Sequence, residues 1–196
     1  MTRLIFALLL MSGVARAQNS DLGFLMGFST TGSSVRVGSA VHVSTLVGAH
    51  GQINYAAQLK ETRAGRLYLE LPLMIGGHAG ATVGGSVYGS AGGMISLTPG
   101  IRLNVAPHSR ISFYAAAGAG PAVFGEDTAT ISPGFVNAST SWTVTLAADF
   151  GGGVDLRLSR LVSLRAEARD FLSQGGLAGV SGHHHPIYSF GLGFHW

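Results

Sequence analysis

Three consecutive histidines, His183, His184 and His185, are the residues whose type most directly suggests chemistry, because imidazole is a common ligand of transition metals. Neighbouring side chains of an extended chain point to different sides, so three in a row seldom converge on one ion. Specific sites also need spaced ligands with supporting hydrogen bonds. The sequence therefore favours a polar loop with weak, incidental metal affinity, and it predicts no dedicated metal site and no cofactor.

Charged side chains form a second group with chemical potential. They recur at alternate positions of otherwise apolar segments, on the face opposite the large apolar side chains. Four are acids and four are arginines: Glu70, Arg102, Asp149, Asp155, Arg157, Arg165, Glu167 and Arg169. Charges enclosed in a narrow interior must pair, because an isolated buried charge is costly. Balanced signs favour a salt-bridged plug, and a narrow path for ions or small apolar solutes is the alternative.

Alternation with a period of two predicts the strands that carry these residues. In eight segments every second residue is apolar: 22–28, 53–59, 67–75, 95–105, 111–117, 142–158, 162–168 and 187–196. They predict an all-β fold, an eight-stranded antiparallel transmembrane β-barrel with its apolar faces toward lipid. A barrel of eight strands is just wide enough for its own side chains, which agrees with a filled interior.

A further alternating stretch, residues 35–43, does not fit this count, because single-chain bacterial barrels keep an even number of strands. It is either a β-extension of the first long loop or the outer half of the second strand. A remaining alternative is that it replaces residues 22–28 as the first strand.

The connections between the segments alternate in length. Three are short and polar: residues 60–66, 106–109 and 159–161. Four are long and rich in Gly, Ser, Thr and His: residues 30–51, 76–92, 125–140 and 172–186. Short periplasmic turns and long extracellular loops are typical of outer-membrane barrels. The pattern and the even strand count predict that both termini lie in the periplasm.

The first 17 residues have the features of a secretory signal peptide, which leaves residues 18–196 as one barrel domain. Arg3 precedes the apolar run Leu4–Met11, and Ala15-Arg16-Ala17 supplies a cleavage site. The run is too short for a membrane-spanning helix of about 20 residues. Loss of Arg3 and Arg16 leaves ten basic and nine acidic residues, so the high isoelectric point does not indicate a nucleic-acid partner.

The last strand has the strongest alternation in the chain. Its large apolar side chains face one way, and small or polar residues lie between them: Tyr188, Phe190, Leu192, Phe194 and Trp196. Trp142 and Trp196 are expected at opposite membrane surfaces. A soluble lipocalin-like barrel is the main architectural alternative, but it would place its apolar residues inside. The charged opposite face and the aromatic ending argue against it.

Together these features resemble small bacterial outer-membrane β-barrel proteins of the OmpA/OmpX-like kind. The alternating aromatic ending at 188–196 looks like the signal that the outer-membrane assembly machinery recognises. Segments 97–102, 150–155 and 165–171 look like a subgroup of these barrels. The resemblance implies a location in the bacterial outer membrane, contact with its lipids and lipopolysaccharide, and the assembly machinery as a partner during biogenesis. It implies little about activity, because the superfamily includes anchors, adhesins, enzymes and small channels.

An enzyme of this superfamily would carry recognisable catalytic residues. Lipid A deacylases carry a His-x-Ser pair on the penultimate strand, where the imidazole activates the hydroxyl. That strand, residues 165–173, contains no histidine here. The segment His42-Val43-Ser44 matches the His-x-Ser motif but lies near the first loop. The sequence therefore predicts no catalytic residue and a non-enzymatic barrel that displays its surface loops, whose ligand is unknown, for structural or interaction roles.

Overall fold

The computed structural model of this chain describes residues 19–37, 40–63, 65–83, 87–132, 135–173 and 184–196. The predicted signal peptide, His183 and the side chains of His42-Val43-Ser44 lie outside the described part. Within it, no helix is long and apolar enough to cross a membrane.

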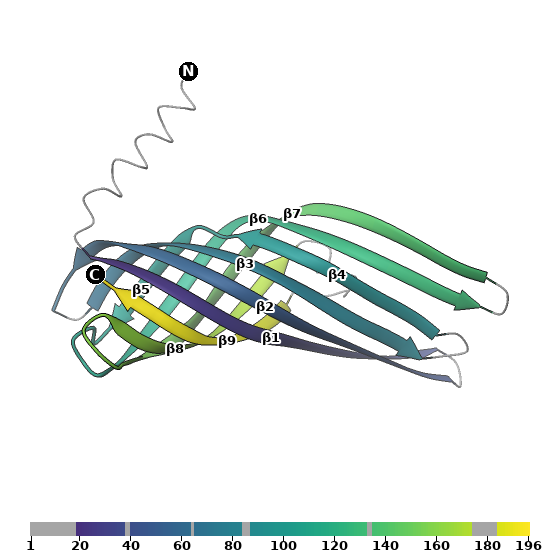
Figure 1. Cartoon of the computed structure of the whole chain (residues 1–196), viewed down its shortest axis with the longest axis horizontal. Helices are drawn as coiled ribbons and strands as arrows, with labels where there is room; N and C mark the ends of the chain where they lie inside the picture. The colour runs from purple at the N-terminus through teal and green to yellow at the C-terminus, as the bar shows by residue number, and fades with distance from the viewer. Residues whose placement is uncertain (1–18, 38–39, 64, 84–86, 133–134, 174–183) are drawn as a thin grey trace, which may run out of the picture.

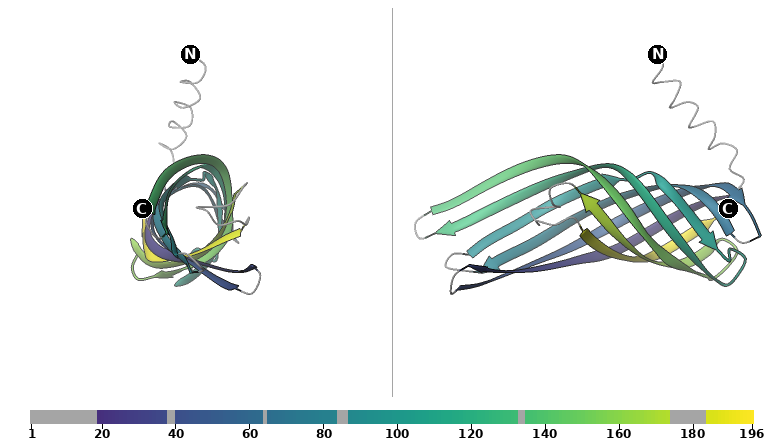
Figure 2. Two further views of the ribbon diagram at one scale, coloured as in Figure 1. Left: turned by 90° about the vertical axis from the view of Figure 1, so that its right-hand side faces the viewer. Right: turned by 180° about the vertical axis from the view of Figure 1, so that it is seen from behind.

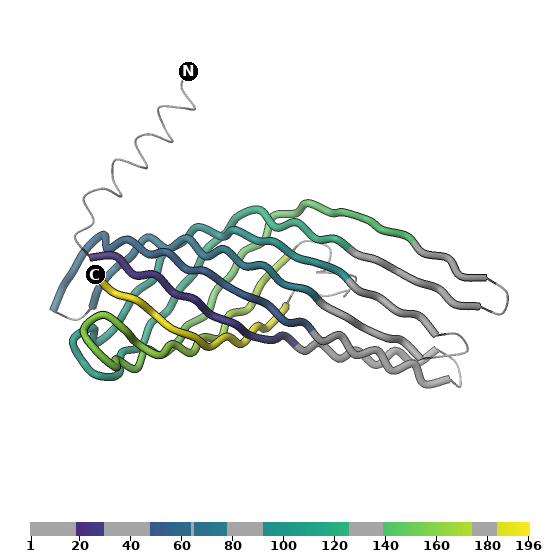
Figure 3. The backbone as a smooth tube through the Cα atoms, viewed as in Figure 1, coloured from purple at the N-terminus to yellow at the C-terminus, as the bar shows by residue number. Residues whose placement is uncertain are grey.

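Nine strands make up the described part of the chain. They are β1 (Ser20–Val37), β2 (Ala40–Glu61), β3 (Gly65–Val83), β4 (Val87–Leu97), β5 (Gly100–Val105), β6 (Ile111–Ser132), β7 (Phe135–Arg157), β8 (Val162–Ser173) and β9 (His184–His195). All pairings are antiparallel, and β1 pairs with β9, so the sheet closes into a ring (Figures 1 and 2). The strands run obliquely to the long axis of the ring, as the backbone tube shows (Figure 3).

β4 and β5 together occupy one position in the ring. Both pair with β3 on one side and with β6 on the other. The interruption falls at Thr98 and Pro99, because proline lacks the N–H that a continuous ladder needs. Pairing continues around it, since the Thr98 N–H donates to Pro72 O at 3.3 Å and the Ala119 N–H donates to Pro99 O at 3.1 Å. The ring therefore has eight positions, and the predicted eight-stranded antiparallel barrel is confirmed.

Three of the predicted long loops consist mostly of paired strand. Val37 pairs with Ala40, so the stretch at 35–43 is shared between the far ends of β1 and β2, and residues 22–28 remain in the first strand. β3 with β4 and β6 with β7 extend their hairpins in the same way. The ladder is built from backbone groups, so it continues through Gly-, Ser- and Thr-rich sequence. We call the end of the ring that these three hairpins form the hairpin end.

The opposite end of the ring, which we call the turn end, carries the short connections and both ends of the described chain. The seam between β1 and β9 is closed there by two backbone hydrogen bonds. The Ser20 N–H donates to Trp196 O at 2.9 Å, and the Trp196 N–H donates to Ser20 O at 3.1 Å.

Side chains on the two faces of the sheet differ as the alternation predicts. Apolar residues of the outer face are exposed, with Phe113 at 61% and Val144 at 73%. Polar and charged residues of the inner face are buried, and Arg102 and Asn54 are both 0% exposed. The barrel thus presents an apolar exterior and encloses polar groups, so the predicted facing is confirmed.

The inner face also has an apolar part that the sequence analysis did not anticipate. We call it the apolar layer: Met74, Met94, Ala122, Phe124, Ala147, Phe171 and Ile187. Met94 packs against both groups of buried residues that compose it. Met74 follows Glu70 along β3 and Phe171 follows Arg169 along β8, in the direction away from the turn end. The apolar layer therefore lies on the hairpin side of the charged residues.

Candidate functional site

Eight buried charged side chains from five of the nine strands meet inside the barrel. We call them the charged layer: Asp21, Glu70, Arg102, Asp149, Asp155, Arg165, Glu167 and Arg169. Each is supplied by a strand whose inward positions alternate with apolar outward ones. The strands thus hold the charges in place, and the interior keeps them from water.

Arg165 ties two acids together. Its Nε donates to Asp155 Oδ1 at 2.7 Å and its Nη2 to Asp155 Oδ2 at 2.9 Å, which makes a two-point contact. It also donates to both carboxylate oxygens of Asp21, at 3.1 and 2.8 Å. Bidentate contacts of this kind fix geometry as well as charge. Arg165 therefore links β8 to β1 and to β7.

Arg169 is the centre of the second group of ion pairs. It lies 2.7 Å from Asp149, 2.8 Å from Glu70 and 2.8 Å from Glu167. The Tyr114 hydroxyl donates to Glu167 at 2.7 Å, and the Gln52 amide donates to it at 2.9 Å. These neutral donors spread the charge of Glu167 over several hydrogen bonds.

Arg102 bridges the two groups. It donates to Asp21 at 2.8 Å and lies 3.5 Å from Glu70. Its guanidinium carbon also lies 4.8 Å from the ring centroid of Tyr68 and 5.4 Å from that of Tyr114. Cation–π contacts of this kind stabilise a guanidinium that has left water.

The composition of the charged layer differs from the predicted four acids and four arginines. Arg157 is half-buried near the turn end, where it donates to Pro107 O at 2.8 Å. Asp21, which the sequence analysis left out, takes a central place. The layer contains five acids and three arginines, because alternation identifies the face of a residue but not its height along the barrel.

Glycines make room for the largest inward side chains. A Cβ at Gly193 would lie 2.7 Å from Ser163 Oγ and 3.4 Å from an Arg165 nitrogen. A Cβ at Gly153 would meet the hydroxyl of Tyr114. At these two positions the tightly filled interior therefore requires glycine.

A serine, a histidine and an aspartate lie in hydrogen-bonding order at the turn end. Ser163 Oγ lies 2.9 Å from His195 Nε2, and His195 Nδ1 lies 3.2 Å from Asp21 Oδ2. This is the order of contacts in a serine-hydrolase triad. However, Ser163 is only 1% exposed, and Asp21 already accepts hydrogen bonds from two arginines. Strand alternation puts Ser163 and His195 at inward positions of β8 and β9, but it does not reveal that they are in contact.

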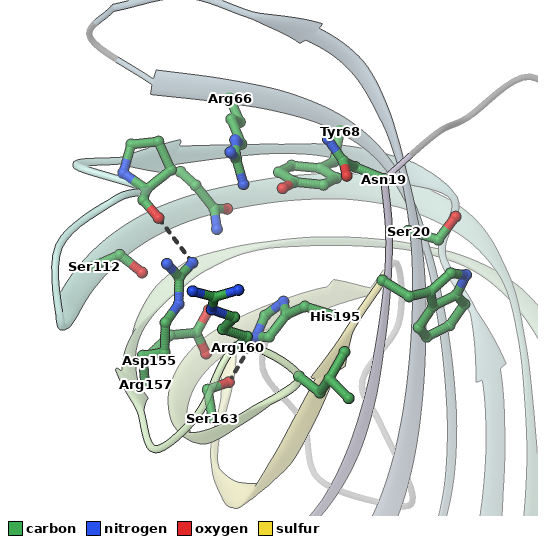
Figure 4. Close-up of a pocket in the computed structure, with 14 residues that line it drawn as sticks. Asn19, Ser20, Arg66, Tyr68, Ser112, Asp155, Arg157, Arg160, Ser163 and His195 are labelled. Atoms are coloured by element: carbon green, nitrogen blue, oxygen red, sulfur yellow. Dashed lines mark hydrogen bonds between the residues drawn. The ribbon is translucent and has the colours of Figure 1, made fainter.

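A pocket with a volume of about 260 Å³ opens beside these residues. Figure 4 shows Arg66, Arg157, Arg160 and His195 around it. Asn19, Ser20 and Trp196 also line it, so it lies at the seam where the ring closes. We call it the mouth pocket.

The aromatic ending keeps the facing that the sequence predicts. Tyr188, Phe190, Leu192 and Trp196 are exposed on the outer surface, and Phe194 is half-buried. Phe194 stands edge-on to Phe24 of β1, with ring centroids 6.1 Å apart. Tyr188 lies 5.9 Å from Phe28. These outward aromatics therefore cross the seam between β9 and β1.

The described histidines of the triple bind a neighbouring acid. His184 Nδ1 lies 2.6 Å from Asp170 Oδ2, and the His185 backbone N–H donates to Asp170 Oδ1 at 2.8 Å. Among the residues that the structure describes, no group of three or more metal-binding side chains is arranged around a common point. The contacts with Asp170 anchor the start of β9 to β8.

No protein-family model matches this chain, and comparison with curated proteins finds no match either. Solved structures are similar in fold. The outer membrane protease OmpT from Escherichia coli has a TM-score of 0.55 at 8% identity, with 92% of this chain and 98% of that chain covered. Ail from Yersinia pestis has a TM-score of 0.48 at 10% identity, with 90% and 99% covered. OprG from Pseudomonas aeruginosa has a TM-score of 0.47 at 10% identity, with 92% and 96% covered.

The closed antiparallel ring, its apolar exterior and its charged interior define a class. The chain has the fold of small outer-membrane β-barrel proteins, and the predicted resemblance to that class is confirmed. Sequence identities of about 10% support a similarity in fold alone. The activity of this barrel therefore depends on its own residues.

Proposed function

We propose that this protein is a non-enzymatic barrel of the bacterial outer membrane whose interior is closed by the charged layer and whose hairpins form a surface for structural or interaction roles. The observation that carries the proposal is the density of ion pairs across the interior. Three arginines hold five acids at distances of 2.7 to 3.5 Å, in side chains that are almost fully buried. A conducting pore would need these groups hydrated and separated.

The orientation belongs to the same proposal. The turn end, with Ser20 and Trp196, lies in the periplasm, and the hairpin end faces the cell surface. Short periplasmic turns and longer extracellular connections are usual in such barrels. Outer-membrane lipids and lipopolysaccharide would contact the exterior, and the assembly machinery would recognise Tyr188, Phe190, Leu192, Phe194 and Trp196.

Conductance in planar bilayers tests the closed interior. We expect the refolded mature chain to show no steady conductance, because the ion pairs fill the lumen. An Arg165→Ala/Arg169→Ala double variant is the matched comparison, since it shortens two of the three arginines without touching the exterior. A stable ion current through the unmodified protein would instead establish the alternative, a narrow channel.

Heat-modifiability on gels tests the barrel and its assembly signal. A folded barrel that resists detergent migrates differently before and after boiling, and we expect that difference here. Removal of Trp196 should slow its appearance, whereas Trp196→Phe, which keeps an aromatic, should restore most of the rate. Good solubility without detergent and no shift would contradict the membrane assignment.

A serine hydrolase is the second candidate, and one observation favours it: the contacts among Ser163, His195 and Asp21. In such an enzyme Ser163 Oγ would attack an ester carbonyl while His195 Nε2 took its proton. The burial of Ser163 and the two arginines on Asp21 argue for a structural role, in which these residues hold β8 and β9 to β1.

A fluorophosphonate probe separates these two candidates, because it labels only activated serines. We expect no labelling of the refolded protein beyond that of a Ser163→Ala variant. Labelling lost in Ser163→Ala, together with a change in the mass of lipid A when the protein is present, would make the hydrolase the correct function.

A further inference from the structure

Basic residues gather at the turn end of the barrel. Of the Lys and Arg residues outside the charged layer, six belong to the turns there or to the strand ends beside them: Lys60, Arg63, Arg66, Arg110, Arg157 and Arg160. Among the described residues of these turns and strand ends, Glu61 is the single acid outside the charged layer. It lies 3.0 Å from Arg66 and 3.1 Å from His108. This end of the barrel therefore has a strong excess of positive charge.

Part of this excess lies in the mouth pocket. Arg66, Arg157, Arg160 and His195 line it, and Asp155 is the only acid among its lining residues. Asp155 is already engaged in an ion pair with Arg165, at 2.7 and 2.9 Å. Three arginines therefore line the pocket against one acidic side chain, so its lining is basic in net terms.

Two arginines have donors available for a ligand. The Arg157 Nη2 donates to Pro107 O at 2.8 Å, which orients the guanidinium and leaves its other N–H groups. Arg160 lies in the exposed turn between β7 and β8. Figure 4 shows both guanidinium groups turned into the pocket. Guanidinium groups match phosphate oxygens in geometry and charge, so two of them lining one pocket can bind the same anion.

We propose that the mouth pocket binds a phosphate group between Arg157 and Arg160. Its volume of about 260 Å³ lies just below the range of about 300–1,000 Å³ for drug-sized ligands, so it suits a small head group. Two sources share this chemistry: the head group of an anionic phospholipid and a soluble phosphate compound. The remaining basic residues of the turn end raise the local concentration of either.

Calorimetric titration of the refolded mature chain in a non-ionic detergent tests the soluble source, with inorganic phosphate as the probe. The buffer is kept at about 0.15 M ionic strength with chloride, so that general attraction is screened. Arg160→Gln is the test variant and Arg63→Gln its matched control, because both remove one exposed positive charge from the same end and only Arg160 lines the pocket. Arg157→Gln is the second test variant.

The lipid source is tested in nanodiscs. Native mass spectrometry would count the phosphatidylglycerol molecules that each variant retains, with phosphatidylcholine, which carries no net charge, as the reference lipid. The folded state of every variant is checked by the gel shift before either titration.

The expected result is saturable binding of at least one probe that weakens about tenfold in Arg160→Gln and in Arg157→Gln, and less than about threefold in Arg63→Gln. Binding of inorganic phosphate identifies a soluble ligand. Retention of phosphatidylglycerol alone identifies the lipid. If Arg160→Gln and Arg63→Gln lost the same affinity for the probe, the binding would reflect the general positive potential of the turn end. That result would overturn the proposed phosphate site in the mouth pocket. Absence of binding by both probes would overturn it as well.

Discussion

The charged layer and the apolar layer fill the same barrel in opposite ways. Both are built from inward strand positions, β3, β7 and β8 contribute to each, and most of their side chains are almost fully buried. In the charged layer, Arg165 donates four hydrogen bonds to Asp21 and Asp155 at 2.7 to 3.1 Å, each with a defined direction. In the apolar layer, Met74 and Phe171 make non-directional contacts. The packing of the charged layer depends on specific hydrogen-bond partners, whereas the packing of the apolar layer depends on side-chain volume.

This difference teaches what each layer contributes. Replacing a complete buried ion pair by apolar groups is often neutral for stability, whereas removing one partner is costly. The charged layer is therefore strong evidence for a single arrangement of strands and weaker evidence for overall stability. An apolar layer accepts other side chains of similar volume. The two layers should respond differently to the same size of change.

Arg165→Met should give the largest loss. It leaves Asp155 without its arginine and Asp21 with Arg102 as its one remaining arginine, so we expect the free energy of unfolding to fall by about 3–5 kcal/mol. Urea titration of the refolded protein, followed by tryptophan fluorescence, measures it. Arg110→Met, at an exposed turn position, should change it by less than about 0.5 kcal/mol. A loss below about 1 kcal/mol in Arg165→Met would show that water reaches the two acids.

Met74→Ala should give an intermediate loss. Met74 is 1% exposed and packs against Phe171 and Ile187, so its truncation leaves a cavity that costs about 2–3 kcal/mol. Met74→Leu keeps the volume and should cost less than about 1.5 kcal/mol. The same urea titration compares the pair. If Met74→Leu lowered the free energy of unfolding as much as Met74→Ala, the apolar layer would require specific side chains as the charged layer does. The proposed difference between the two layers would then be wrong.

Tyr114→Phe should give the smallest of the three losses. It removes the hydroxyl that donates to Glu167 at 2.7 Å, while Arg169 and Gln52 remain in contact with that acid. A hydrogen bond to a charged group contributes about 1.5–3 kcal/mol, and we expect the low end here because the other donors to Glu167 remain. Tyr188→Phe, on the exposed outer face, is the control and should have an effect near zero. Equal effects of the two substitutions would place the Glu167 carboxylate in contact with solvent.

The sequence predicts the strands and their facing because alternation is a direct consequence of strand geometry. It does not predict where the hairpins end, since the backbone ladder of β6 and β7 continues through residues 125–140 without an apolar pattern. It also misses Asp21, which stands alone near the start of β1. The height of each residue along the barrel depends on the stagger between strands, which no single strand encodes, and so Arg157 was grouped with the charged layer.

The apolar layer was missed for a related reason. Met74 lies at an inward position of a strand whose other inward residues include Tyr68 and Glu70, and the alternation alone groups it with them. Only the packing with Phe171 of β8 and Ile187 of β9 distinguishes it. The contacts among Ser163, His195 and Asp21 likewise join residues from three strands that are far apart in the chain, so they could not be read from spacing.

The seam between Ser20 and Trp196 has a consequence for the order of folding. It joins the two most distant parts of the described chain, so it is the pairing with the greatest entropic cost of loop closure and the slowest to form. Until β1 reaches β9, Asp21 cannot compensate Arg102 and Arg165. An open ring would carry both guanidinium groups into hydrocarbon with one of their two acid partners missing, so strand insertion and ring closure should occur as one concerted event.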